Sequence, residues 1–290
     1  MDSVALDALQ PAALGAYGGG WQARLRTRVA RSGGRSAIAA LEHHGPLRLQ
    51  KGLWPEGPDP LHLILLHPPG GIAAGDRLSV DLEVSEGAHA LVTTPGAGRW
   101  YRADALATQS IRLAVGDRAS LEWLPQETIV HDGALAESSL EVELSEHACG
   151  IGWEITVFGR HASGERFSQG ELRQATRVLR GGRPLFEEAS LARGGLGDDP
   201  VSLAGMHVAG LLWACADREI DPSLAESAEA AMLAKTEGFA GASRVDGHLL
   251  LARVVESSPE RARAALCAAW QVLRPALLGR AASLPRIWAT

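Results

Sequence analysis

The sequence predicts a mainly β protein: a large β domain followed by a smaller C-terminal α/β segment with about two helices. Three observations support this fold class. Short apolar or alternating runs recur every 8–12 residues, turn-forming Gly, Pro and Asp residues lie between them, and no helical pattern appears before residue 200. From these observations alone, sandwich, barrel and stacked-sheet architectures all remain open.

The predicted strands begin at Trp21–Val29, where apolar and basic residues alternate as in a half-exposed strand. Gly33 and Gly34 form a turn, and Ser36–Leu41 returns. The later predicted strands are 46–50, 61–67, 77–84, 88–94, 107–115, 118–124, 126–131, 138–144, 151–160, 166–180 and 183–191. We see no clear internal repeat in this series.

Two helices are predicted in the C-terminal part. Asp221 and Pro222 are typical of a helix start, and the first helix follows them to Lys235. The second starts at Ser258, and its apolar stripe extends up to Pro275. A strand is expected at Gly247–Val255 between them.

These elements suggest three parts without a linker between them. Residues 1–20, rich in Ala, Gly and Pro, are expected to form a loose N-terminal arm. Residues 21–200 are expected to form the β-rich core. Residues 201–290 are expected to form an α/β segment that packs on the same domain.

Composition excludes several classes of protein. The 290-residue chain has a net charge of −6 and a pI near 5.9, so bulk attraction to nucleic acid or to an anionic membrane is not expected. Three widely spaced cysteines argue against a disulfide scaffold or a structural zinc site. The first twenty residues lack a basic region, and the uncharged run 200–216 falls short of the ~20 residues that span a bilayer. We therefore expect a cytoplasmic, soluble protein.

A Gly- and Pro-rich stretch, His67–Asp76, follows an apolar run that suits a buried strand. Two prolines prevent helix or central strand from continuing, and three glycines permit a tight turn that holds the carboxylate of Asp76. No Gly-Lys-Ser/Thr follows, so the stretch is not a nucleotide-binding loop.

Two further stretches carry unusual residues. The glycines of Thr93–Arg102 could form an anion nest, but the β context favours a hairpin turn. In Leu121–Ala134, Glu127, His131 and Asp132 fall close together, and on a strand Glu127 and His131 would share one face. That arrangement suits a metal or acid/base pair, although a solvated strand rim with a turn aspartate explains it equally simply.

Together these stretches resemble the urease accessory protein UreD family, called UreH in some bacteria. The runs Leu124–Val130 and His67–Gly71 are its most specific features. The matching runs cover roughly residues 21–195 in the family's order: Gly45–Leu47, Trp54–Gly57, His67–Leu78, Thr93–Arg102, Leu121–Ala134, Ile151–Glu154, Gly159–Arg160 and Ala162–Glu165.

The resemblance implies a β-rich fold of stacked sheets and a nickel-insertion chaperone that is not an enzyme. It implies partners, UreF and the GTPase UreG, which act with the chain on the urease apoprotein, and it allows a dimer within that complex. GTP hydrolysis belongs to UreG, which agrees with the lack of a nucleotide-binding loop here. No tightly bound cofactor is expected, only transient passage of Ni²⁺.

The resemblance also has departures. Gly98 and Arg99 stand where the family commonly has a hydroxyl residue and lysine, and His131 stands where it usually has phenylalanine.

For a nickel chaperone, loosely binding carboxylates suit transfer better than a cage of imidazoles and thiolates. We hypothesise that Asp76, Glu127, Asp132 and Glu154 line an internal polar passage for nickel. The alternative for Asp76 and Asp132 is that they accept hydrogen bonds from turn amides. Two rival functions are a metal-dependent hydrolase built on Glu127, His131 and Asp132, and a plain scaffold that presents UreF and UreG to urease.

Overall fold

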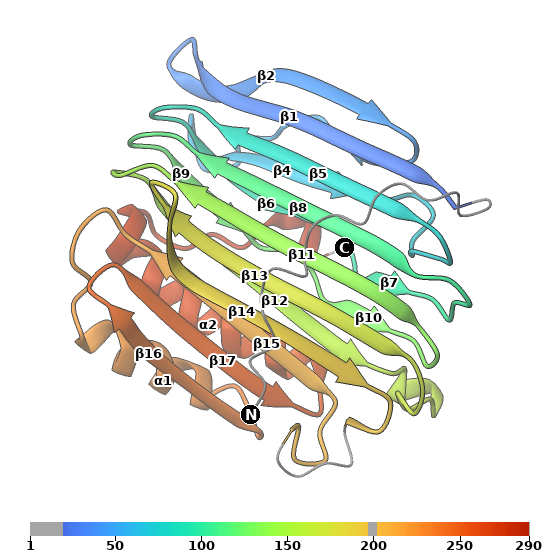
Figure 1. Cartoon of the computed structure of the whole chain (residues 1–290). Helices are drawn as coiled ribbons and strands as arrows, with labels where there is room; N and C mark the ends of the chain where they lie inside the picture. The colour runs from blue at the N-terminus through green and yellow to red at the C-terminus, as the bar shows by residue number, and fades with distance from the viewer. Residues whose placement is uncertain (1–19, 197–201, 290) are drawn as a thin grey trace.

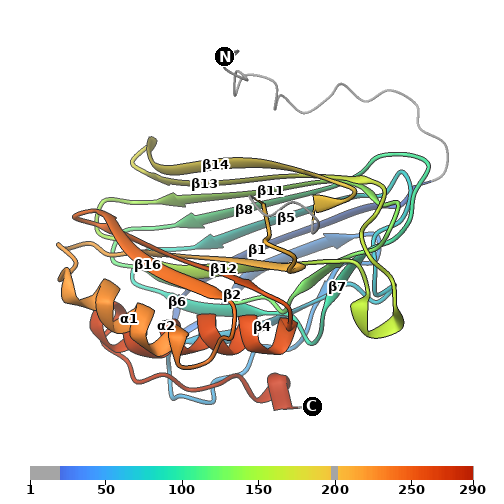
Figure 2. The same cartoon turned by 90° about the horizontal axis from the view of Figure 1, so that it is seen from below.

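The computed structural model describes residues 20–196 and 202–289, and these form two large β-sheets stacked face to face, with two α-helices on the outer side of one sheet (Figures 1 and 2). The predicted mainly β fold is therefore confirmed. The expected N-terminal arm, apart from Gly20, lies outside the described residues, and the division at residues 200 and 201 stays a prediction.

The first sheet has seven strands within the described residues. In spatial order they are β14 (Arg183–Arg193), β13 (Glu171–Arg180), β11 (Leu135–Leu144), β8 (Ala107–Val115), β5 (Arg77–Val84), β1 (Gln22–Ser32) and β2 (Arg35–His44).

The second sheet has ten strands within the same residues. Its main path is β16 (Phe239–Asp246), β17 (Leu249–Glu256), β15 (Val208–Cys215), β12 (Cys149–Phe158), β9 (Ser120–Trp123), β6 (His89–Thr93), β4 (Leu61–Leu66) and β3 (Arg48–Leu49). Two short strands, β7 (Gly98–Trp100) and β10 (Thr128–Val130), branch from it by pairing with each other and, through β10, with β12.

Between β4 and β13 the chain winds as a coil and alternates between the two sheets. Strands β5, β8, β11 and β13 add to the seven-stranded sheet in parallel. Strands β4, β6, β9 and β12 add in parallel to the other sheet. Because β1 pairs in parallel with β5, the N-terminal hairpin β1–β2 extends the first sheet at one edge.

Three equivalent tight turns join successive coils at one end of the molecule. The runs 82–89, 113–120 and 142–149 each end a strand on an apolar residue, turn, and enter the next strand through Ala88, Ala119 or Ala148. Each of these alanines donates its backbone N–H to the carbonyl three residues earlier, at 3.0–3.1 Å. The chain thus contains an internal repeat of about 30 residues that our sequence reading missed, because only the turns are alike in sequence.

Longer connections stack at the opposite end, and they contain the stretches singled out in the sequence. Residues 67–76, 94–106 and 124–134 join equivalent strands of successive coils. Ile72 bridges to Trp100, and β7 pairs with β10 in parallel. The predicted hairpin turn at Thr93–Arg102 is therefore wrong: the segment is a connection that contributes a short parallel strand.

The interior has two apolar layers on either side of the ten-stranded sheet. Alternate residues of β12 divide between them: Trp153 and Ile155 face the helices, whereas Phe158 belongs to the layer between the sheets. The outer face of the seven-stranded sheet is not covered by any described helix, and its alternate residues are mostly charged or polar.

The C-terminal residues complete the second sheet and cover it. Helices α1 (Ser223–Leu233) and α2 (Pro259–Leu278) lie against its outer face (Figure 2). The expected end of the second helix at Pro275 is wrong, because buried Leu273 and Leu277 keep the helix packed beyond the proline until Gly279 ends it. The exposed edge strand β16 was not predicted. No described helix is long and apolar enough to cross a membrane.

Candidate functional site

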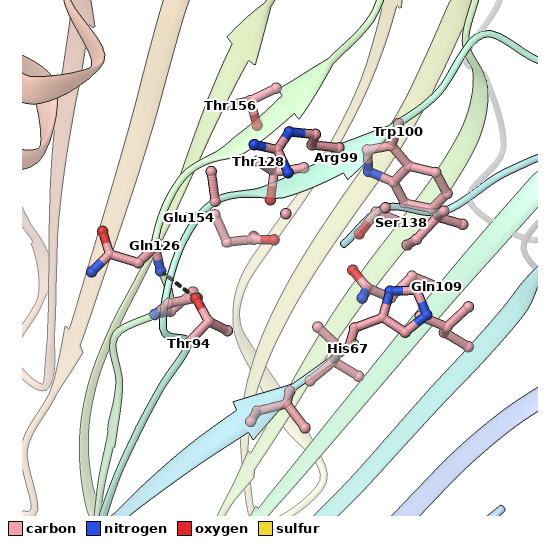
Figure 3. Close-up of a pocket in the computed structure, with 18 of the residues that line it drawn as sticks. His67, Thr94, Arg99, Trp100, Gln109, Gln126, Thr128, Ser138, Glu154 and Thr156 are labelled. Carbon is pink, nitrogen blue, oxygen red and sulfur yellow. Dashed lines mark hydrogen bonds between the residues drawn. The ribbon is translucent and has the colours of Figure 1, made fainter. Parts of the chain in front are cut away.

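A cavity of about 240 Å³ lies between the two sheets, beneath the stacked connections (Figure 3). Residues of the connections His67–Ile72 and Thr94–Trp100 form part of its wall. Strands of both sheets form the remainder. The tight backbone of the first connection depends on Gly71, where a Cβ atom would lie 2.4 Å from the ring of Tyr101.

Polar side chains cross the inner face of the seven-stranded sheet in one row. Gln109, Ser138 and Gln174 are register partners on β8, β11 and β13, and Ser190 continues the row on β14. They occupy inward positions at which neighbours along the same strands, such as Leu140, are apolar. The row borders the cavity and places neutral hydrogen-bonding groups where apolar side chains would otherwise pack.

Glu154 faces this row from β12 of the other sheet (Figure 3). Its carboxylate accepts hydrogen bonds from Thr176 Oγ1 at 2.5 Å and Gln174 Nε2 at 3.2 Å. Burial raises the pKa of Glu154, and the charge of Glu188 adds to the effect, whereas the two hydrogen bonds oppose it. No cation within the described residues pairs with Glu154, so this carboxyl group favours its neutral form more than an exposed glutamate does.

A second cavity, also about 240 Å³, lies next to the first. Glu154, Thr156 and Gln174 border both cavities. The second reaches the edge where β14 lies beside β15 and β17, and Glu188 pairs with Arg253 across that edge. A polar lining therefore runs from the stacked connections to the side of the molecule, with Glu154 near its middle.

His67 and Arg99 contribute further polar groups to the first cavity. Burial lowers the pKa of His67, although the negative charge of Asp76 partly opposes this, so the imidazole is neutral near pH 7 and keeps a lone pair. Gly98 leaves space beside Thr128, since a Cβ atom there would make an ordinary 3.7 Å contact with the Thr128 hydroxyl. The hydroxyl that the family commonly carries at this position would therefore reach the same wall.

Asp76 is buried and anchors the turn that it ends. Its carboxylate accepts hydrogen bonds from the backbone N–H of Trp21 at 2.7 Å and of Ala73 at 2.8 Å. It does not line either cavity. These contacts fit the turn-amide alternative.

Asp132 holds two connections together. It accepts hydrogen bonds from Ser168 N and Oγ and from Gln169 N at 2.7–2.9 Å, and it pairs with Arg102 at 2.8 Å. Burial alone would raise its pKa, but these donors lower it. Its acceptor sites are thus already used.

Glu127 and His131 flank the short strand β10, and each has an unsatisfied buried atom within the described residues, Oε2 and Nε2 respectively. The rings of His131 and Tyr101 pack edge to face, with their centroids 5.0 Å apart. Burial and then the charge of Arg160 lower the pKa of His131, with Glu165 opposing them. The metal roles predicted for Asp76, Glu127, Asp132 and Glu154 remain untested.

No three His, Cys, Asp or Glu residues of the described chain lie together in a way that could hold a metal ion. Glu127, His131 and Asp132 therefore do not form a preassembled hydrolase centre there. The cavity instead offers one carboxylate, one imidazole, several amides and hydroxyls, and the guanidinium of Arg99, a set that can bind a divalent cation only weakly.

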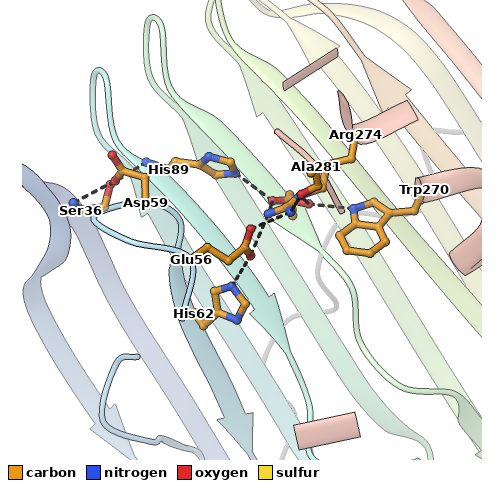
Figure 4. Close-up of polar contacts among 9 residues, drawn as sticks. Ser36, Glu56, Asp59, His62, His89, Trp270, Arg274 and Ala281 are labelled. Atoms are coloured by element: carbon orange, nitrogen blue, oxygen red, sulfur yellow. Dashed lines mark hydrogen bonds and ion pairs between the residues drawn. The ribbon is translucent and has the colours of Figure 1, made fainter. Parts of the chain in front are cut away.

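A second buried polar cluster lies on the opposite face of the ten-stranded sheet, under α2 (Figure 4). Arg274, fully buried, donates to both Glu122 and Glu56 at 2.8–3.0 Å. Glu122 also accepts from Trp270 at 2.7 Å and contacts His89 at 2.9 Å, and Glu56 contacts His62 at 2.8 Å. Every carboxylate oxygen of Glu56 and Glu122 has a partner, and no residue of this cluster lines either cavity.

Sequence reasoning singled out Glu154 but missed His67 as a site residue and missed the Gln109–Ser138–Gln174 row. A signal was available: each residue of the row is polar at an inward position of an otherwise alternating strand. Reading it would have required knowing which strands are neighbours.

Comparison with known proteins gives a consistent result. A family model described as UreD urease accessory protein matches residues 22–289. A protein of Azoarcus sp. (strain BH72) named urease accessory protein UreD is 44% identical over 292 residues, covering 100% of this chain and 98% of its own length. Proteins of the same name from Delftia acidovorans and Pseudomonas aeruginosa (strain PAO1) are each 43% identical, over 98% and 93% of this chain and 99% and 95% of their own lengths.

Proposed function

Because the chain belongs to the UreD urease accessory protein family, we propose that it conducts nickel through the space between its two sheets during urease maturation. The family consists of non-catalytic accessory proteins that take part in assembly of the nickel metallocentre. The finer proposal is that this chain works in complex with UreF and the GTPase UreG on the urease apoprotein, and that Ni²⁺ crosses it as cargo.

The observation that carries the proposal is the continuous polar lining past Glu154. A polar row across the inside of a β sandwich displaces apolar packing, which makes it an unfavourable choice for stability alone. Glu154, Thr156 and Gln174 stand between two neighbouring cavities and border both, which supports a path past Glu154.

The chemistry of the lining suits transit better than storage. An ion must be held well enough to enter and weakly enough to leave. Imidazole ligands would hold Ni²⁺ strongly, and the cavity presents one imidazole, that of His67. Its oxygen ligands are those of amides, hydroxyls and Glu154, and the positive charge of Arg99 in the same wall would weaken cation binding further. Glu154 would release its proton as the cation approaches, because a nearby positive charge favours the ionised carboxylate.

The test replaces Glu154 with alanine and, separately, with glutamine, in the full chain together with UreF, UreG and urease apoprotein. We expect both variants to assemble the complex as the wild type does while the nickel content of urease falls at least fivefold. The matched control is Glu141→Gln, which removes a carboxylate from the outer face of the seven-stranded sheet, away from both cavities. Wild-type nickel content in both Glu154 variants would contradict the conduit.

The same experiment separates the plain scaffold from the conduit. A scaffold needs only an intact outer surface, so Glu154→Gln would then assemble and load nickel normally. The hydrolase alternative has no support in the arrangement of Glu127, His131 and Asp132 in the described chain.

A further inference from the structure

The basic residues of this acidic protein are unevenly distributed. Seven of its 28 arginines and lysines fall between residues 22 and 51, where Glu42 is the one acid, whereas the whole chain carries −6. In the structure this stretch is the hairpin β1–β2, at one edge of the seven-stranded sheet, followed by β3 and residue 51 at an edge of the ten-stranded sheet (Figure 1). We call this surface the basic edge; its members are Arg24, Arg26, Arg28, Arg31, Arg35, Arg48 and Lys51.

Several of these charges are left without compensation. Arg24 and Arg26 share one carboxylate, Asp81, at 3.3 and 3.4 Å. Arg28 and Lys51 are exposed and form no ion pair within the described residues. Arg28 is in register with Glu83 of β5, Arg26 is in register with Glu42 of β2, and Arg31 pairs with Asp59. With Asp81 these are four acids beside seven cations, so the basic edge keeps an excess of positive charge.

Strand β2 itself is open along half of its length. It is the last strand of its sheet, and residues 39–44 are exposed on both faces. Its first half is covered, since Ser36 N donates to Pro58 O at 3.2 Å and Trp54 Nε1 donates to Ser36 O at 2.7 Å. Beyond Ala39 no described backbone group outside β1 pairs with it. A free strand edge of this kind is a template for one more strand.

Two other terminal strands, β16 and β14, differ from β2. Strand β16 has α1 packed beside it. Strand β14 uses Glu187 and Glu188 in ion pairs with Arg177 and Arg253 and has no excess of one charge. Among β2, β14 and β16, strand β2 combines an open backbone edge with an excess of basic over acidic neighbours.

We propose that residues 39–44 of β2 are a docking edge for an extended, acidic segment of a partner protein, which adds to the seven-stranded sheet as an eighth strand. Backbone hydrogen bonds would supply affinity, and the basic edge would select acidic side chains. Leu41, 40% exposed, would cover an apolar side chain of the incoming strand. This surface is remote from the cavities, whose lining includes none of these residues.

The first test uses a defined probe, a fluorescent ten-residue peptide of alternating Glu and Val, with the full chain. We expect binding that weakens at least tenfold between 50 and 500 mM salt. It should also weaken at least tenfold in the double variant Arg28→Glu/Lys51→Glu. Arg183→Glu is the matched control, because Arg183 is an exposed arginine of β14, at the opposite edge of the same sheet. A Lys/Val peptide should not bind.

The second test asks whether a strand is added. Amide hydrogen exchange of residues 39–44 should slow at least tenfold when the acidic peptide or the complex of maturation partners is bound, with β14 unchanged. Unchanged exchange at β2 would overturn the inference, as would tighter binding of a 20-nucleotide DNA or of anionic vesicles than of the acidic peptide. The inference relies on the proposed function only for the choice of partner complex. If a complex loads nickel but leaves amide exchange of β2 unchanged, the docking edge is contradicted and the nickel conduit is not.

Discussion

Two inward-facing carboxylates on neighbouring strands of one sheet, Glu122 fully buried and Glu154 partly buried, have opposite surroundings. Glu122 on β9 faces the helices, and Glu154 on β12 faces the space between the sheets. Glu122 meets Arg274, Trp270 and His89 in a fully paired cluster. Glu154 has two neutral donors and a cavity on each side. A cluster whose hydrogen-bonding groups are all paired stabilises the fold. A carboxylate that has no cationic partner and lies beside a cavity can accept a cation.

The largest effect is expected from breaking the saturated cluster. Arg274→Met removes the cation and leaves Glu122 and Glu56 buried without it, which should lower the free energy of unfolding by about 3–5 kcal/mol. Urea unfolding at pH 7 measures the loss. The control is Gln271→Ala, on the exposed side of the same helix, which should change stability by less than about 0.5 kcal/mol. A small effect of Arg274→Met would mean that the cluster does not fix α2.

Lowering the pH should weaken the same cluster, because Glu56 becomes protonated. Burial alone would raise its pKa, but hydrogen bonds and charge from His62 and Arg274 lower it from 4.5 to about 2. Its ionised form therefore stabilises the fold above pH 4.5 by roughly 3 kcal/mol, and this contribution is lost as the pH falls toward 2. Wild type should thus exceed Glu56→Gln in stability at pH 6, and the difference should shrink steadily at lower pH. A constant difference would contradict the assignment.

A smaller effect on stability is expected at Asp132, whose carboxylate is fully hydrogen-bonded between two of the long connections. Asp132→Ala removes the acceptor of Ser168 and Gln169 and should cost about 1–2 kcal/mol. If the residue is only an anchor, Asp132→Asn should leave nickel loading of urease at the wild-type level. A loss of loading in a folded Asp132→Asn variant would instead favour its predicted metal role.

The smallest effect on stability is expected at Glu154, where the effect on function should be greatest. Glu154→Gln keeps shape and hydrogen bonding, so the free energy of unfolding should change by less than about 1 kcal/mol. Because folding raises the pKa of Glu154, its neutral form stabilises the fold at low pH and that contribution fades as the pH rises. The stability of Glu154→Gln relative to the wild type should therefore increase from pH 5 to pH 8, which thermal unfolding of both proteins will measure. A relative loss over this range would mean that Glu154 is paired with a cation.

The sequence predicted the fold class and most strands because period-two patterns mark each strand locally. It did not predict the coil, because pairing joins strands about 30 residues apart, and only the short turns before Ala88, Ala119 and Ala148 repeat in sequence. The end of α2 was misplaced since the lost N–H of Pro275 is outweighed by burial of Leu277, a tertiary effect.

The site was predictable only in part. Glu154 was among the candidates because it lies in a run that resembles the family. His67 and Gln174 were not, because their meeting depends on which face of each strand points inward and on which strands become neighbours. The resemblance gave the family directly, since its motifs are the connections that the coil stacks together.

The position of Arg274 near the end of the chain has a consequence for synthesis. Its partners Glu56 and Glu122 precede it by 218 and 152 residues, so a ribosome must release nearly the entire polypeptide before the two acids meet their counter-ion. Nascent chains that stop short of α2 would carry every strand of both sheets, but part of the outer apolar face of the ten-stranded sheet would lack its helix and the two acids would lack their cation. Loss of the last thirty residues should thus leave aggregates or degradation products instead of a shortened but native protein.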